Sequence, residues 1–314
     1  MDLSSLNILD KPEYVFRPAQ IVRRLLRGRA AVGKGDFAEA VLPWGLKIRF
    51  NPRELIGASI WRMGIYDLCV SEAIWRLLDI GESALDAGAN IGHMASAMAA
   101  RVGPAGTVTA FEPHPEIFEA LAANIRAWKG SPRVGRIEAR RVALSDTAGT
   151  AVLSISDDFE QNQGGSYLVS NDDARRPPAS RNTKGRSFPV QTSRLDDMIG
   201  SGCRIGLMKI DVEGHEIAVL QGGVGLFDQH RIRDVVFEEH NPYPTPVTEF
   251  LEARGYVLFQ IAKRFSGLEV RSTAEPPVRK GRSYEPPNYV ATIDPERALK
   301  RLRRRGWSVF ADAR

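Results

Sequence analysis

The residues whose types and spacing are best suited to chemistry form a small-residue loop between an apolar run and a helix. Residues 83–93 read Ser-Ala-Leu-Asp-Ala-Gly-Ala-Asn-Ile-Gly-His, so the apolar run carries an acid, Asp86, near its end. Gly88 and Gly92 allow a tight turn and let a ligand approach where a Cβ would clash. An alanine-rich helical segment follows to about Arg101 and directs its unpaired N–H groups toward the loop. The pattern predicts a strand–loop–helix cradle for a nucleotide-like cofactor.

The glycine spacing of this loop separates two cofactor classes. Dinucleotide-binding loops read G-x-G-x-x-G, and their second glycine lets a pyrophosphate reach the backbone. Here Asn90 and His93 stand where the second and third glycines belong. Asp86 would repel a pyrophosphate, but it would suit the cationic amino-acid end of S-adenosylmethionine. The loop therefore favours S-adenosylmethionine, with a nicotinamide-dependent oxidoreductase as the alternative.

A second acid, Glu112, follows the strand expected at Thr107–Phe111. An acid about 20 residues beyond a glycine-rich loop is positioned to accept hydrogen bonds from both hydroxyls of a ribose. Because both cofactors carry a ribose, Glu112 does not discriminate between them.

Three further acids and a histidine lie within residues 211–216, directly after an apolar strand that begins at Ile205. Ligands of an open parallel sheet sit beyond the carboxyl ends of its strands, and alternation puts Asp211 and Glu213 on one side. Together with His215 and Glu216 they form a cluster whose members must perturb one another's pKa values, which marks a candidate catalytic site. The alternative is a helix N-terminus, where acids interact favourably with the helix dipole. The carboxylates also offer the oxygen ligands that a divalent cation accepts, although no specific metal motif is present.

The next expected strand, Asp234–Glu238, is followed by His240. Its carboxyl end faces the same cleft, so His215 and His240 are the two histidines available as a general base, with unperturbed pKa values near 6.5. A structural role is the alternative for each.

The alternation of expected elements predicts an α/β fold with a doubly wound, mostly parallel sheet and helices on both faces. A further edge strand is expected at Asn288–Ile293, and an additional strand pair at Ala148–Ile155 and Phe188–Thr192. The expected strands are Ala84–Asp86, Thr107–Phe111, Arg136–Leu144, Ile205–Val212, Asp234–Glu238 and Tyr256–Ile261. The expected helices are Ile91–Arg101, Glu116–Lys129, Arg194–Ile199, Glu216–Phe227 and Val247–Arg254.

Three segments are distinguished along the chain. Residues 1–59 form an N-terminal extension, with an amphipathic helix expected at 18–29 and a hairpin at 39–50. Residues 60–293 form the catalytic domain, which opens with a helix expected at 60–78. This domain contains a polar insertion at 156–187, either a lid or disordered. Residues 294–314 form a basic tail.

Composition narrows the class of protein. The 314 residues carry a net charge of +5, and arginines and lysines gather near both ends. Such clusters contact nucleic acid or an anionic membrane surface in some proteins, but solvated helix faces are the simpler interpretation. Cys69 and Cys203 are far apart in the sequence, so neither a zinc site nor a disulfide framework is indicated. This favours a cytoplasmic location for the protein. No transmembrane run, signal pattern or nucleic-acid-binding module is evident.

Taken together, the motifs resemble the FkbM family of S-adenosylmethionine-dependent methyltransferases over roughly residues 60–262. Order and spacing match as well as residue type. The matching pieces are residues 86–92 (Asp-Ala-Gly-Ala-Asn-Ile-Gly), 110–113 (Ala-Phe-Glu-Pro), 143–146 (Ala-Leu-Ser-Asp) and 209–216 (Lys-Ile-Asp-Val-Glu-Gly-His-Glu). The chain departs from the family at two positions: Tyr66-Asp67 replaces the usual Tyr-Glu before the first core helix, and His93 stands where the family usually has an aromatic or small residue.

The resemblance implies a Rossmann-like, seven-stranded class I methyltransferase sheet with its last strand antiparallel. It also implies methyl transfer to a hydroxyl of a sugar, glycan or secondary metabolite, with S-adenosylmethionine as cofactor. Asp211, Glu213, His215 and His240 are the catalytic candidates from the residues themselves. By resemblance, Glu112 would hold the ribose, while Asp146 or the backbone around Leu144 would border the adenine. The methionine end would be held by Asp86, Gly88, Asn90 and Gly92, and Asp67 joins the expected cofactor contacts.

Overall fold

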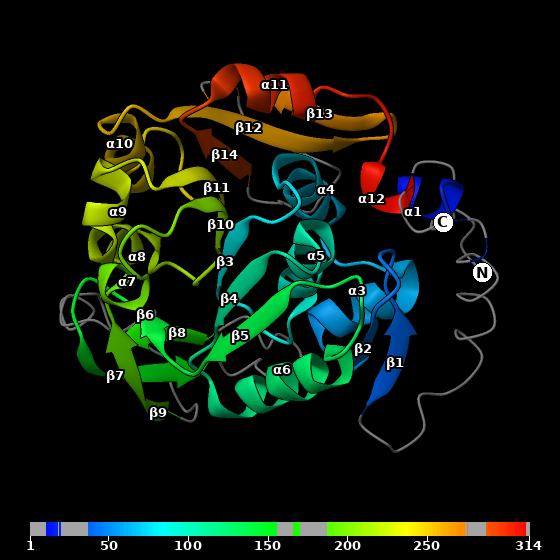
Figure 1. The fold of residues 1–314 in the computed structure, drawn as a ribbon, viewed down its shortest axis with the longest axis horizontal. Helices are drawn as coiled ribbons and strands as arrows, with labels where there is room; N and C mark the ends of the chain where they lie inside the picture. The colour runs from blue at the N-terminus through cyan, green and yellow to red at the C-terminus, as the bar shows by residue number, and fades with distance from the viewer. Residues whose placement is uncertain are drawn as a thin grey trace.

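A computed structural model describes residues 11–17, 19, 37–155, 166–169, 187–273, 275 and 287–311. Its centre is an eight-stranded sheet of order β13-β12-β14-β11-β10-β3-β4-β5 (Figure 1). The strands are β3 (Ser83–Ala87), β4 (Thr107–Phe111), β5 (Arg136–Arg140), β10 (Ile205–Ile210), β11 (Ile232–Glu238), β12 (Val257–Arg264), β13 (Gly267–Arg271) and β14 (Asn288–Thr292).

The doubly wound, mostly parallel sheet predicted from the alternation is confirmed. Strands β5, β4, β3, β10 and β11 pair in parallel, while β14 runs antiparallel to both β11 and β12. Two details differ from the expectation. β14 is an interior strand rather than an edge strand, and β13 adds an eighth strand outside the predicted seven. A hairpin from β12 places β13 at that edge.

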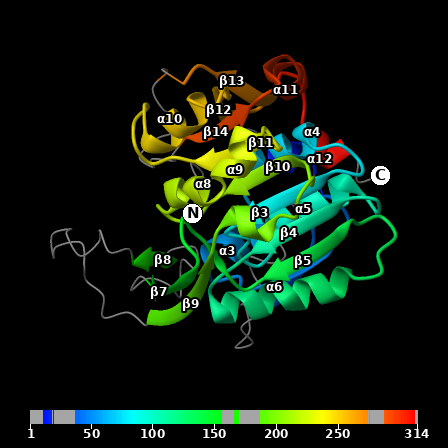
Figure 2. The same cartoon turned by 60° about the vertical axis from the view of Figure 1, so that its left-hand side comes forward.

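Helices cover both faces of the sheet, as Figures 1 and 2 show. Every residue of β10 is buried, as expected for a central strand enclosed on both sides. α4 (Leu68–Leu77), α5 (His93–Val102) and α11 (Pro295–Leu302) contribute to one apolar cluster. α7 (Leu195–Met198), α8 (Glu216–Gly222), α9 (Val224–Asp228) and α10 (Pro246–Glu252) contribute to the cluster on the other face.

The predicted N-terminal hairpin is confirmed and packs on α6 (Pro115–Trp128). It pairs β1 (Ala38–Val41) with β2 (Lys47–Phe50). On α6, the Asn124 side chain exchanges hydrogen bonds with the backbone of Arg49, at 2.9 and 3.0 Å. The short helix α1 (Pro12–Val15) precedes the hairpin, whereas most of the helix predicted at 18–29 lies outside the described residues.

The helix predicted at 60–78 is wrong as a single element. It is two helices, α3 (Leu55–Met63) and α4, separated by a turn. Gly64, in the left-handed conformation at φ 78°, ends α3, and the Asp67 carboxylate accepts a hydrogen bond from Val70 N–H to begin α4. The break places Tyr66 and Asp67 beside the carboxyl ends of the strands, where they line cavities.

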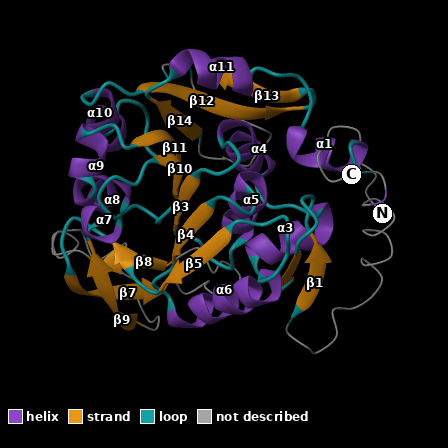
Figure 3. Ribbon diagram, viewed as in Figure 1, coloured by secondary structure: helices purple, strands orange, loops and turns teal. Residues whose placement is uncertain are grey.

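A second, four-stranded sheet of order β6-β9-β7-β8 lies beside α8 and contains the predicted strand pair (Figure 3). Its strands are β6 (Ala143–Leu144), β7 (Gly149–Ile155), β8 (Ser166–Val169) and β9 (Ser187–Ser193). The single strand predicted at 136–144 is therefore wrong, because its two ends, β5 and β6, belong to different sheets. The helix predicted at 216–227 is likewise two helices, which meet at Gly223.

The C-terminal residues pack on α4 rather than standing apart from it. The buried Arg76 guanidinium donates to the carbonyls of Leu302, Arg304 and Gly306. The carboxylate of Glu72 accepts from the N–H groups that begin α12 (Ser308–Ala311). Some of the arginines near the C-terminus therefore form contacts within the protein, since Arg297 and Arg301 also form ion pairs with Asp79. Among the described residues, no helix has the length and apolarity needed to cross a membrane.

Candidate functional site

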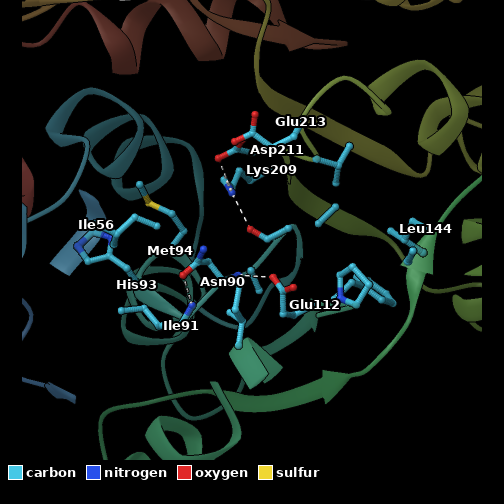
Figure 4. A pocket seen from close by; sticks show the side chains of 18 of the residues that line it. Ile56, Asn90, Ile91, His93, Met94, Glu112, Leu144, Lys209, Asp211 and Glu213 are labelled. Carbon is cyan, nitrogen blue, oxygen red and sulfur yellow. Dashed lines mark hydrogen bonds and ion pairs between the residues drawn. The ribbon is translucent and has the colours of Figure 1, made fainter. Parts of the chain in front are cut away.

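A cavity of about 320 Å³ lies at the carboxyl ends of β3, β4, β10 and β11, the edge at which a ligand is expected in this fold. Its floor is the predicted loop between β3 and α5, including Gly88, Asn90 and Ile91. Figure 4 shows Asn90 and Glu112 on one side and Lys209, Asp211 and Glu213 on another.

The two loop glycines are also required by the protein's own packing, a reason that the sequence did not indicate. Both have the positive φ expected of a tight turn, 77° at Gly88 and 92° at Gly92. A Cβ on Gly88 would lie 1.8 Å from the carbonyl oxygen of Asp211, and one on Gly92 would lie 2.7 Å from Leu121 on α6. Gly88 therefore lets the β3 loop touch the end of β10, and Gly92 lets α5 begin close to α6. Gly92 does not line the cavity.

Glu112 directly follows β4 and lines the cavity beside the loop. Its side chain is 6% exposed, and its two oxygens accept from Asn90 N–H and His114 N–H, each at 2.9 Å. Each oxygen retains a further lone pair for a hydroxyl donor. Burial raises the pKa of Glu112 to about 7, although the two backbone hydrogen bonds oppose the shift. Asn90 adopts φ 48°, a conformation that asparagine tolerates, and this directs its N–H at Glu112.

The wall beyond Glu112 is apolar and comes largely from the second sheet. Leu144, an expected cofactor contact, lines it with Val142. Leu153 and Leu168 add side chains from β7 and β8, so a described part of the predicted insertion contributes to the cavity. Asp146 does not line the cavity. It is exposed and accepts hydrogen bonds from Ser145 and Thr147.

Lys209, which sequence analysis did not single out as a site residue, connects the loop to the acid cluster. It is buried near the end of β10, and its Nζ lies 3.5 Å from Asp86 and 3.2 Å from Asp211 while donating to the Gly88 carbonyl at 3.1 Å. Burial alone would lower the pKa of Lys209, but the carboxylates of Asp211 and Asp86 raise it above its ordinary value. Asp86 is fully buried beneath the cavity and compensates this charge. The sequence feature that could have identified Lys209 as a site residue is its position as the one charged residue of an otherwise apolar strand.

The acid end of the cavity is formed by Asp211, Glu213 and a carboxylate that sequence analysis passed over, Glu238. Partial burial and the neighbouring carboxylates of Asp211 and Glu216 raise the pKa of Glu213 to about 7. Burial, followed by repulsion from Asp211, Asp67 and Glu213, raises the pKa of Glu238 to about 8. This end of the cavity therefore favours positive charge.

The two candidate histidines are placed differently. His240 lines the cavity, with its Nε2 3.7 Å from Glu238 Oε1. His215 does not line it, and its Nε2 shares a 3.0 Å hydrogen bond with the Ser145 hydroxyl. Asp67 also lies outside this cavity but lines the neighbouring one.

His93, at the start of α5, is buried and uncharged. Burial lowers its pKa to about 3, and its Nε2 accepts from the backbone N–H of Tyr66 at 3.2 Å. The Trp44 and Tyr66 rings approach its ring edge-on. His93 thus connects the break between α3 and α4 to the cofactor loop. In the part of the chain that the structure describes, no group of three or more His, Cys, Asp or Glu side chains is arranged to hold a metal ion.

The chain is similar in sequence to known methyltransferases. A family model described as the methyltransferase FkbM domain matches residues 86–258. The 31-O-demethyl-FK506 methyltransferase FkbM of Streptomyces tacrolimicus is 32% identical over 217 residues, covering 62% of this chain and 80% of that protein. Methyltransferase 1 of Beauveria bassiana is 30% identical over 190 residues, covering 55% and 72% respectively. The hexuronic acid methyltransferase AglP of Haloferax volcanii is 30% identical over 218 residues, covering 66% and 77%.

Proposed function

Because this chain belongs to the FkbM methyltransferase family, we propose that it transfers a methyl group from S-adenosylmethionine to a hydroxyl oxygen of a small molecule or sugar. Two relatives carry names that specify a 31-O-demethyl substrate and a hexuronic acid. Family membership sets aside the nicotinamide-dependent oxidoreductase considered from sequence.

The observation that carries the proposal is the position of Glu112. Its buried carboxylate is held by two backbone N–H groups, and its remaining lone pairs suit the two hydroxyls of a ribose. The apolar wall around Leu144 suits an adenine ring, and Asp211 and Glu213 suit an ammonium group and a sulfonium. The chain thus offers a complementary group for each part of S-adenosylmethionine.

S-adenosylmethionine, when bound, supplies an electrophilic methyl group on a positively charged sulfur. The chain must align an acceptor oxygen with that methyl group, exclude water and receive the hydroxyl proton. Asp211, Glu213 and His240 line the cavity and are candidates for the proton acceptor. His215 was predicted alongside them, but it does not line the cavity, and its Nε2 shares a hydrogen bond with the Ser145 hydroxyl.

Calorimetric titration tests the cofactor assignment. We expect S-adenosylhomocysteine to bind and NAD to give no heat of binding above dilution. Turnover is then measured by mass spectrometry, with methyl-labelled S-adenosylmethionine and cell extract as the source of acceptor. The labelled product is tested for an O-methyl group, and Asp211→Ala should lower its formation. Binding of NAD in preference to S-adenosylhomocysteine would contradict the proposal.

A further inference from the structure

We propose that a second cavity, separated from the first by Tyr66 and Glu238, receives the methyl acceptor as an uncharged, hydroxyl-rich ring, and that Glu238 accepts its hydroxyl proton. This inference rests on the proposed methyl transfer and adds to it an acceptor site, an acceptor class and a base.

The second cavity has a volume of about 500 Å³. It shares Leu55, Tyr66 and Glu238 with the first cavity. A third space of only about 10 Å³ is also lined by Tyr66 and Glu238. These two side chains therefore stand at the junction, where an acceptor in one cavity meets a methyl donor in the other.

The polar lining of the second cavity suits hydroxyl donors. Glu13 on α1 is 1% exposed, and its Oε1 accepts from Lys263 Nζ at 2.8 Å, whereas its buried Oε2 has no hydrogen-bond partner. A buried carboxylate oxygen without a donor is unfavourable, and a ligand hydroxyl would satisfy it. Ser59 and Asn288 add further groups that form hydrogen bonds with hydroxyls.

The charge balance of this cavity disfavours an anionic acceptor. The carboxylates of Glu13 and Asp67, joined by that of Glu238 above about pH 8, face two cations, Lys263 and Arg271. Both cations are already engaged, Lys263 with Glu13 at 2.8 Å and Arg271 with Glu275 at 2.9 Å. A uronate or phosphate would therefore be repelled. The apolar part of the lining suits the C–H face of a ring and consists of Leu55, Met63, Ile65, Leu68, Ile261 and Ala262.

Glu238 occupies the place that a base requires. It ends β11, lines both cavities, and has a pKa raised by burial to about 8, near the pH at which a general base works best. The acceptor oxygen forms a bond to the methyl carbon, the carbon–sulfur bond breaks with its electron pair going to sulfur, and the hydroxyl proton moves to the Glu238 carboxylate.

The titratable and charged groups around Glu238 come from three places. They are Asp211, Glu213 and Lys209 from β10 and its loop, Tyr66 and Asp67 before α4, and His240 beyond β11.

The binding experiment uses the full chain saturated with S-adenosylhomocysteine. Neutral methyl glycosides and the matched uronates and sugar phosphates are added at millimolar concentration, and contact is measured by saturation-transfer NMR. We expect signals from neutral glycosides only. Ala262→Phe, which fills the second cavity, should abolish them, whereas Val257→Phe, at an exposed position on the same strand, should not. Absence of signal from every neutral glycoside, or a preference for the charged ones, would overturn the acceptor assignment.

Turnover tests the base. With a neutral glycoside that binds, the wild-type kcat should rise with pH and level off above about pH 8. Glu238→Gln should lower kcat, measured at saturating S-adenosylmethionine, about 10²- to 10⁴-fold and remove this rise, and binding of S-adenosylhomocysteine shows that the variant is folded. Unchanged kcat in Glu238→Gln, or binding of glycosides without any methyl transfer, would refute the inference. Failure of S-adenosylhomocysteine to bind the wild type would instead refute the proposed function, so the two failures are distinguishable.

Discussion

Replacement of Glu112 by glutamine is the most direct test of the cofactor site. Each oxygen of Glu112 accepts one backbone N–H at 2.9 Å and is expected to accept one ribose hydroxyl. An amide retains one acceptor oxygen and turns its NH₂ toward a backbone donor, so one charge-assisted hydrogen bond to the ribose is lost. Such a bond contributes about 1.5–3 kcal/mol, so we expect the Kd for S-adenosylhomocysteine to rise about 10- to 150-fold.

The pH dependence of binding gives the same test a second readout. With a pKa of about 7, Glu112 is mostly ionised at pH 8 and mostly protonated at pH 6. If the carboxylate binds the ribose, wild-type affinity should fall by at most about tenfold between pH 8 and pH 6, that is, by at most about 1.4 kcal/mol. Glu112→Gln should lose this contribution to the pH dependence, because an amide does not titrate in this range.

Calorimetry at both pH values measures these effects, with Glu119→Gln as the matched control. Glu119 is exposed on α6, outside the cavity, and its replacement should leave Kd unchanged at both pH values. Thermal melts check that Glu112→Gln remains folded. A folded Glu112→Gln protein with a Kd within threefold of wild type and an unaltered pH dependence would refute the ribose assignment.

Three further predictions concern the loop and its supports. Lys209→Met should lower the free energy of unfolding by about 3–5 kcal/mol in urea titrations, because Asp86 is left buried and uncompensated, and adding Asp86→Asn should restore part of it. Gly88→Ala should destabilise the protein by more than the roughly 1–2 kcal/mol expected for Gly130→Ala. Both glycines have positive φ, but only at position 88 would the added Cβ meet a backbone oxygen. Equal thermal shifts of the two variants would contradict this packing argument. His215→Asn should leave the Kd for S-adenosylhomocysteine within about threefold, since His215 lies outside the cavity, and a larger calorimetric change would assign it a cofactor contact.

Local patterns predicted much of the fold, whereas contacts between distant segments did not follow from them. β4 matches its predicted bounds, and Glu112 stands beside Asn90 as the strand–loop spacing indicated. The position of β14 between β11 and β12 was missed because order along the chain does not give order across a sheet. The close contact of Gly88 with the Asp211 carbonyl was not predicted, because the two residues are 123 positions apart in the sequence.

The candidate site was only partly foreseen for a related reason. Glu238 ends a predicted strand, but its significance depends on two cavities that meet beside it. The sequence shows Lys209 only as one residue of a motif. Its charge is recognisable as part of the site only from the ion pair with Asp86 on the neighbouring strand. Tyr66 reaches the site because α3 and α4 are separate helices, a break that the continuous apolar pattern concealed.

The hydrogen bonds from Arg76 to the backbone around residues 302–306 have a consequence for biosynthesis. Arg76 lies on the helix that follows Tyr66 and Asp67, yet its acceptors are made more than two hundred residues later. On the ribosome, α4 cannot attain its final hydrogen bonding until that late segment has emerged, because a buried guanidinium needs its acceptors.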